Sequence, residues 1–83
     1  MKTLLLLTSI FAAQSALALT TEDAITQTDN AMNMMNIAEL QKLASETTDY
    51  AKAYANYRLG VGANLVGKSE LAIEALTQSA LTL

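Results

Sequence analysis

Paired acidic side chains are the residues of this chain that come closest to a catalytic arrangement. Glu22 and Asp23 are adjacent, and Glu70 and Glu74 are one helical turn apart. Paired carboxylates can act as general acid and base, or can bind a hard cation. The chain contains no His and no Cys, so it lacks the commonest general base, the thiol nucleophile and the usual ligands for zinc, haem and iron–sulfur clusters. We therefore interpret the acid pairs as helix-start and surface charges, and expect no catalytic, cofactor-binding or metal-binding residue.

Three glycines could suggest a phosphate-binding loop. In the pattern G-x-G-x-x-G, Gly60 and Gly62 would be followed by a third glycine at position 65, which is Leu65. No strand is expected before Gly60, and the motif requires one. The glycines are therefore expected to be structural.

Aromatic and methionine side chains offer a second kind of chemistry, which is apolar binding. Three tyrosines lie at helical spacing, at Tyr50, Tyr54 and Tyr57. They could stack on a glycan or a peptide, but we favour a packed seam between helices, with Arg58 paired to Glu74 or Asp49 at the surface. The methionines Met32, Met34 and Met35 could form an adaptable binding patch; we expect them to be core.

Residues 1–18 have the three parts of a secretory signal. Lys2 provides the positive start, residues 4–13 form an apolar stretch, and Ala16-Leu17-Ala18 is a small-x-small cleavage site. The apolar stretch is shorter than the roughly 20 residues that a membrane span needs. We expect export, with cleavage near Ala18 and a periplasmic or secreted product. A retained membrane anchor is the alternative.

Residues 19–83 would form one small acidic domain. Loss of Lys2 leaves four basic side chains against eight acidic ones, a net charge of −4. That balance disfavours nucleic acid and anionic membrane surfaces as partners, so contact with the membrane is expected only through the signal peptide. Without cysteines, so small an exported domain depends on packing alone. We therefore expect it to associate with itself or with another protein or peptide.

The domain is expected to be all-α. The chain has no Pro, and its β-branched residues are modest in number and scattered, with Val only at positions 61 and 66. Four helices are expected at about Glu22–Met35, Ile37–Thr47, Tyr50–Val66 and Ser69–Thr82. Short turns between them require antiparallel neighbours, that is, helical hairpins.

Local signals set the ends of these helices. Thr20 with Asp23, and Asn36 with Glu39, have the spacing of a capping box, in which the first side chain accepts a hydrogen bond from the third following amide. Thr48 or Asp49 is expected to start the third helix, and Gly67 to end it in a left-handed conformation.

The apolar residues predict one buried face for each helix. These faces are Ile25, Met32 and Met35; Ile37, Leu40, Leu43 and Ala44; Tyr50, Tyr54, Tyr57, Val61 and Leu65; and Leu71 or Ala72 with Ala75, Leu76, Ala80 and Leu83. Gly60 and Gly62 lie inside the third helix, where each costs about 1 kcal/mol relative to Ala. A close neighbouring helix is expected to compensate for that cost.

The two hairpins are similar in pattern. At offsets of 33 and 34 residues, apolar positions such as Leu40 and Ile73, or Ile25 and Leu59, pair with one another. This period resembles that of the tetratricopeptide repeat, a unit of about 34 residues made of two antiparallel helices.

The resemblance is carried by the segment from Ala53 to Leu83. Leu59-Gly60 stands where the first helix of the family has leucine and a small residue, Gly67 at the turn glycine, and Ala72 at the small residue of the second helix. The segment departs from the family pattern in four respects: Asn56 stands at the early aromatic position, Ala63 at the later one, the closing alanine is shifted to Ala80, and no proline ends the unit. The peptide-clamping residues of some members have no match, so none is assigned.

The resemblance implies an exported adaptor or scaffold of one to two such hairpins, which binds protein or peptide and catalyses nothing. Three repeats are commonly needed for a stable array, and this chain offers at most two. The alternative is a small signal-anchored protein that serves as a helical accessory subunit of an inner-membrane complex.

Overall fold

The fold of residues 19–83 consists of four α-helices, and this part of the chain contains no strand. The structure is a computed structural model; the expected signal peptide, residues 1–18, lies outside the described residues. The helices are α2 (Thr21–Asn33), α3 (Ile37–Glu46), α4 (Asp49–Leu65) and α5 (Ser69–Thr82). The all-α prediction is confirmed, and each helix end lies within two residues of its predicted position.

The predicted caps are present. The Thr20 hydroxyl accepts a hydrogen bond from the Asp23 amide at 3.0 Å, and the Asn36 side-chain oxygen accepts one from the Glu39 amide at 3.1 Å. Each bond satisfies an amide that has no partner within its own helix. At the start of α4, Thr48 takes the cap position without a side-chain hydrogen bond. The starts of α2 and α3 are therefore fixed by capping residues that directly precede each helix.

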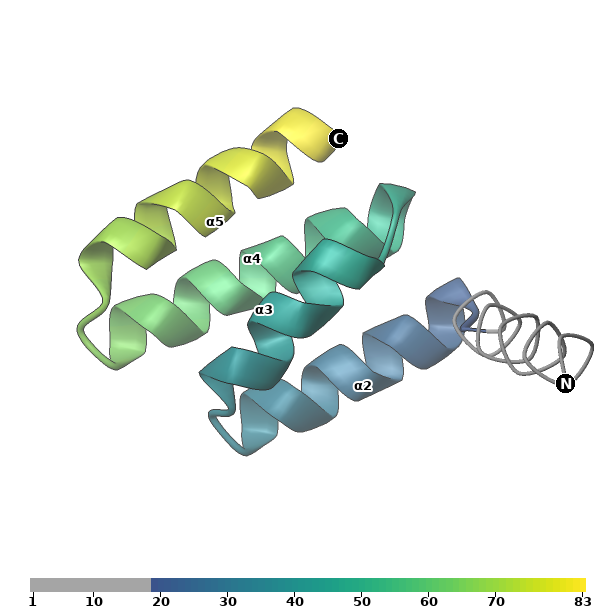
Figure 1. The fold of residues 1–83 in the computed structure, drawn as a ribbon, viewed down its shortest axis with the longest axis horizontal. Helices are drawn as coiled ribbons and strands as arrows, with labels where there is room; N and C mark the ends of the chain where they lie inside the picture. The colour runs from purple at the N-terminus through teal and green to yellow at the C-terminus, as the bar shows by residue number, and fades with distance from the viewer. Residues whose placement is uncertain (1–18) are drawn as a thin grey trace, which may run out of the picture.

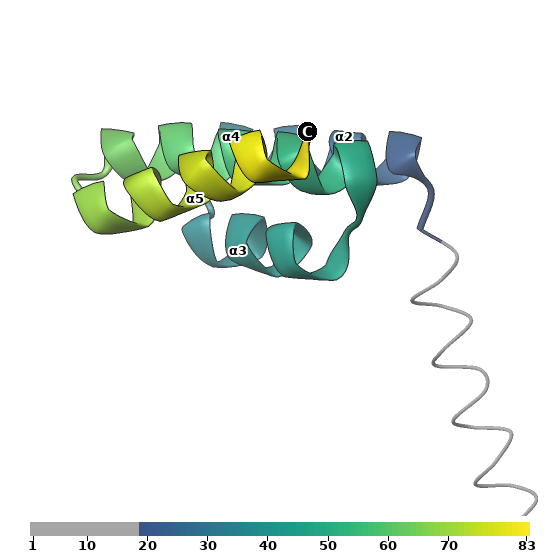
Figure 2. The ribbon, with the colours of Figure 1, turned by 90° about the horizontal axis from the view of Figure 1, so that it is seen from above.

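Consecutive helices run antiparallel, and α4 is central (Figure 1). Helix α4 contacts α2, α3 and α5, whereas α5 packs on α4 alone among the helices of residues 19–83. Figure 2 shows α2, α4 and α5 near one level with α3 on one side of them. The opposite side of α4 has no helix of residues 19–83 over it. We call this the open side of α4.

Small side chains allow α4 to pack between three neighbours. The core has Leu40, Leu43 and Leu59 as its large buried residues, and alanines make up most of the rest. The buried residues of α4 are Ala51, Ala53, Ala55, Asn56, Leu59, Gly60, Gly62 and Ala63. Two buried hydroxyls are bonded to backbone carbonyls: the Thr28 hydroxyl donates to the Ala24 carbonyl and the Ser79 hydroxyl to the Ala53 carbonyl, both at 2.7 Å.

Several predicted buried faces are wrong. The prediction holds for α3, where Leu40, Leu43 and Ala44 are buried and Ile37 packs against them. In α2 the buried residues are instead Ala24, Thr28 and Ala31, whereas in α5 the predicted Ala72 and Ala75 are buried together with Ser79. Residues that were expected to be buried but are exposed are Met35, Tyr50, Tyr57, Leu65, Leu76, Ala80 and Leu83. Of the large apolar side chains of α4 only Leu59 is buried, and those of α5 are half-buried or exposed.

Close approach of neighbouring helices explains the two glycines inside α4, as expected. A Cβ atom added to Gly60 would lie 2.5 Å from Leu76 Cγ and 3.3 Å from the Ala72 carbonyl oxygen on α5. A Cβ added to Gly62 would face the other neighbours, 3.2 Å from Ile37 Cδ1. Gly67 ends the helix region with φ of +81°, the left-handed conformation predicted for it.

The two hairpins repeat with a shift of 32 residues, so the sequence pairing at 33 and 34 is wrong. The turn after α2 contains a hydrogen bond from the Asn36 amide to the Ala31 carbonyl, and the turn after α4 contains the same bond from Lys68 to Ala63. The left-handed residue of each turn is shifted equally, from Met35 to Gly67. Backbone geometry identifies this register because apolar residues alone pair almost as well one or two positions away.

Candidate interaction surfaces

Tyr50 and Tyr57 lie on the open side of α4, so the packed seam between helices that the sequence favoured is limited to Tyr54. Tyr50 and Tyr57 are 58% and 49% exposed. Tyr54 is half-buried between α4 and α2, and its ring stacks on that of Tyr50 with centroids 6.3 Å apart. Two aromatic side chains are therefore available to a partner, while the third holds two helices together.

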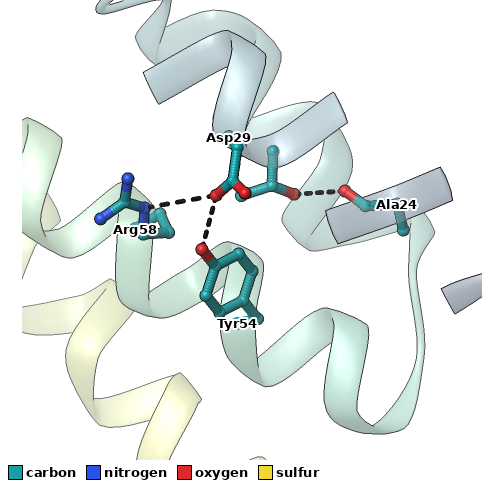
Figure 3. A network of polar contacts seen from close by, with 5 residues as sticks. Ala24, Asp29, Tyr54 and Arg58 are labelled. Atoms are coloured by element: carbon teal, nitrogen blue, oxygen red, sulfur yellow. Dashed lines mark hydrogen bonds and ion pairs between the residues drawn. The ribbon is translucent and has the colours of Figure 1, made fainter. Parts of the chain in front are cut away.

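Tyr54 belongs to a polar cluster that joins α4 to α2 (Figure 3). Its hydroxyl donates a hydrogen bond of 2.5 Å to Asp29 Oδ1, and Arg58 Nε lies 3.9 Å from the same oxygen. Arg58 was expected to pair with Glu74 or Asp49; its partner is Asp29, because Arg58 lies on the side of α4 next to α2. The Arg58 guanidinium carbon lies 6.0 Å from the centre of the Tyr54 ring, within reach of a cation–π contact.

The chemistry of this cluster is structural. The hydrogen bond to Asp29 is the largest cause that raises the pKa of the Tyr54 hydroxyl above its usual 10.0, followed by burial and the Asp29 charge. The phenol therefore keeps its proton at neutral pH and cannot act as a base. The ion pair is partly exposed, where such pairs contribute about 0–1 kcal/mol. We assign the cluster to the α2–α4 contact.

A hollow opens between α4 and α5, on the side away from α3. Its volume is about 410 Å³, and none of the residues that line it is charged. The lining is Gly60, Val61, Asn64, Leu65, Ser69, Ala72, Ile73 and Leu76. Leu65 and Ile73 on its rim are 66% and 68% exposed. We call this hollow with its apolar rim the α4–α5 face.

A smaller apolar hollow lies farther along the same two helices. It holds about 180 Å³ between Tyr50, Tyr57 and Leu83, and again no charged residue lines it. The two hollows together make the side of the α4–α5 pair away from α3 an uncharged strip. Contiguous exposed apolar surface of this kind marks sites of protein or membrane contact.

The groove on the other side of the α4–α5 pair, next to α3, has a different character. It measures about 220 Å³, and its lining mixes apolar residues such as Leu59 and Leu71 with polar and charged ones, including Lys52 and Glu74. The Lys52 ammonium donates a hydrogen bond of 2.5 Å to the Ala44 carbonyl in the last turn of α3. The charge of Lys52 therefore already satisfies a helix end.

The other residues that the sequence singled out lie apart. The acids Glu22, Asp23, Glu70 and Glu74 are exposed, and within residues 19–83 no three His, Cys, Asp or Glu side chains gather closely enough to hold a metal ion. Met34 and Met35 are exposed in the turn after α2, contrary to the expected core position, while Met32 is half-buried against the core. The hollow between α4 and α5 was missed because residues of two helices line it. Its only sign in the sequence was Gly60 together with the short side chains at Ser69 and Ala72.

Comparison of the chain with protein-family models, with curated proteins and with solved structures gives no match. Among residues 19–83, no helix combines the length and the apolar character needed to cross a membrane.

Proposed function

We propose that this protein is an exported, non-catalytic protein-interaction module built from two tetratricopeptide-like helical hairpins. Its partner is a protein or a peptide that buries the α4–α5 face. The single observation that carries the proposal is the uncharged, exposed apolar rim of that face, on helices whose contacts with each other are tightly packed.

The roles of three residues support the tetratricopeptide-like assignment. Gly60 is where α5 approaches α4, Gly67 adopts the left-handed turn conformation, and Ala72 is buried in the contact between these helices. These are the roles that the family resemblance implies for the same positions. The equal shift of all turn hydrogen bonds between the two hairpins supports a repeat architecture in addition.

Binding at the α4–α5 face would depend on shape and apolar burial. Its lining has no titratable group, so recognition does not depend on a salt bridge. Exposed Leu65 and Ile73 provide large side chains for contact, and the hollow beside them can receive one from the partner. Large anchors that fill pockets carry most of the binding energy of a typical interface.

Photo-crosslinking in the producing cells tests this proposal. A p-benzoylphenylalanine at Ile73 should give a discrete covalent adduct with protein. The matched control is the same probe at Leu81, which is 74% exposed on α5 but does not line either hollow. The Ile73 adduct should disappear in the background of Leu65→Glu. Equal labelling from both positions, or none from Ile73, would contradict the proposal.

The mass of the recovered chain separates export with cleavage from a retained anchor. Loss of residues 1–18 supports the exported module. An intact N-terminus in the membrane fraction supports the alternative, a signal-anchored accessory subunit. Crosslinking from Ile73 is informative in both cases, because the α4–α5 face lies entirely within residues 19–83.

A further inference from the structure

The 32-residue shift between the two hairpins indicates what kind of side chain fits the hollow of the α4–α5 face. In the first hairpin, Met32, Ile37 and Leu40 form a seat beneath α4: each has an atom within 3.5 Å of the position of a Cβ on Gly62. A shift of 32 residues places Asn64, Ser69 and Ala72 at the same positions of the second hairpin. All three line the 410 Å³ hollow. The hollow is thus the second hairpin's equivalent of the seat on which α4 rests.

The side chains at the two seats differ in length, and this difference determines which side chain a docking helix must insert. In the first seat, three long side chains fill the space, so the helix that rests there has a glycine, Gly62, at the contact. In the second seat the corresponding side chains are short, which leaves the hollow. A helix that docks there must therefore insert a bulky apolar side chain, since an unfilled hole forfeits dispersion contacts.

The α4–α5 face itself carries such side chains. Leu65 and Ile73 project from the rim of the hollow, and each is about two-thirds exposed. Where a hollow and a projecting side chain lie next to each other, a two-fold axis can place the projecting side chain of each copy in the hollow of the other, which is an isologous contact. No charged residue lines the hollow, so two copies can pair there without burying a charge in it.

Head-to-tail stacking of copies would instead bring α2 of one copy onto α5 of the next, and α2 is unsuited to it. The side of α2 that faces away from α4 is polar and exposed; its residues are Asp23, Gln27 and Asn30. These three residues each come one position before a buried residue of α2. Asp29 and Met32, which contact α4, each come one position after a buried residue, so the two sets lie on different sides of the helix. None of the three polar residues could fill an apolar hollow without losing its hydration.

We infer that the partner of the α4–α5 face is a second copy of this chain, in a two-fold dimer in which Leu65 and Ile73 of each copy enter the hollow of the other. This inference rests on the proposed function and names the partner at the proposed surface. The dimer would cover the apolar rim from both sides and give α5 the second packing surface that it lacks.

Sedimentation equilibrium on the protein as recovered from producing cells, from micromolar to hundreds of micromolar concentration, tests the dimer. The expected mass at the upper end is twice that of one chain. Ile73→Glu should raise the dissociation constant at least about tenfold, and the matched control Leu81→Glu should leave it within about twofold. Circular dichroism should show equal helicity for both variants, since both positions are exposed.

Ser69→Ile separates the hollow from general apolar stickiness. Ser69 is exposed at the first position of α5, and isoleucine there recreates the first seat, where Ile37 is the equivalent residue. The substitution adds apolar surface, yet it should weaken the dimer at least several-fold because it fills the space that the partner's side chain needs. Stronger association of Ser69→Ile would overturn the inference.

The outcomes distinguish this inference from the proposed function. A monomer at every concentration, together with an Ile73 adduct to a different protein, would overturn the dimer and leave the interaction module standing. No adduct at all would overturn both. An Ile73 adduct whose mass is twice that of the chain supports both.

Discussion

Replacing Gly60 and Gly62 separately by alanine measures how closely α5 packs on α4. The two glycines are two residues apart in one helix, so alanine gives the same intrinsic gain of about 1 kcal/mol at each. They differ in surroundings. At Gly60 the new methyl group would lie 2.5 Å from Leu76 Cγ and 2.7 Å from its Cδ2, well inside van der Waals contact. At Gly62 the nearest atoms are the flexible ends of Ile37 and Met32, at 3.2 and 3.3 Å.

The expected signs are therefore opposite. Forcing Leu76 out of its contact costs about 1–3 kcal/mol, which exceeds the helix gain, so Gly60→Ala should lower the free energy of unfolding by about 1 kcal/mol. A cost in the middle of that range, about 2 kcal/mol, less the helix gain of about 1 kcal/mol gives this net loss. Gly62→Ala needs a shift of only a few tenths of an ångström from two side-chain ends, so it should raise stability by about 0.5–1 kcal/mol.

Thermal and urea unfolding followed by circular dichroism would measure the pair. A gap of about 1.5 kcal/mol corresponds to roughly 6–12 °C in Tm for a domain of this size. Both variants should be compared at the same low protein concentration, because association makes Tm depend on concentration. An equal gain at both positions would refute the close α4–α5 contact, and with it the geometry from which the hollow is described.

Three further predictions concern the caps, the turn and the polar cluster. Asn36→Ala removes the acceptor for the Glu39 amide and should cost about 0.5–2 kcal/mol in urea unfolding; Ser45→Ala, which removes an exposed hydrogen bond within the same helix, should cost less. Gly67→Ala should cost about 1–2 kcal/mol because φ is +81° there; no neighbouring atom would clash, so the cost comes from the backbone conformation alone. Met35→Ala, at the equivalent left-handed position, should change stability little because Met35 already carries a Cβ. Equal effects would contradict the turn assignment. The folded state raises the pKa of Tyr54, so the folded protein holds the phenol proton more tightly than the unfolded chain does. The stability that the Tyr54–Asp29 hydrogen bond adds is therefore fully present below pH 10.0 and is lost as the pH rises above it. Tyr54→Phe should therefore reduce the fall of Tm above pH 10.0, and an unchanged alkaline slope would count against the Tyr54–Asp29 hydrogen bond.

Features set by neighbouring residues could be predicted from the sequence. The caps at Thr20 and Asn36 each involve an amide three residues away, and the left-handed turn at Gly67 follows from the lack of a Cβ. The helix bounds follow from these signals and from helical periodicity. The requirement that a neighbour lie close to Gly60 and Gly62 was likewise predictable from the cost of glycine in a helix.

Features that depend on which helices are neighbours could not be predicted in the same way. Periodicity identified the row from Tyr50 to Leu65 as apolar, but whether it is buried depends on a helix that covers it, and no helix of residues 19–83 does. The core of α4 is formed by its small residues because three helices converge there. The hollow could not be predicted because its lining combines Ser69 and Ala72 of α5 with Gly60 and Asn64 of α4.

The repeat register failed for a related reason. Apolar residues recur every three or four positions along a helix, so pairing two helices by hydrophobicity alone leaves an uncertainty of that order. The turn resolves it, since Met35 and Gly67 share a backbone conformation although they share no side-chain property. Register is carried by the backbone of the turn, which the sequence signals only where the residue is glycine.

The most direct measurement of whether the α4–α5 face is the contact surface is the solvent accessibility of isoleucine methyl groups. Residues 19–83 contain only Ile25, Ile37 and Ile73, so selective methyl labelling gives three assignable signals. In dilute protein, a soluble paramagnetic agent should relax the Ile73 methyl most strongly, since Ile73 is 68% exposed. When the protein associates with itself or its partner, we predict that Ile73 becomes protected while Ile25 and Ile37 change little. An Ile73 methyl that stays fully accessible in the associated protein would contradict the account.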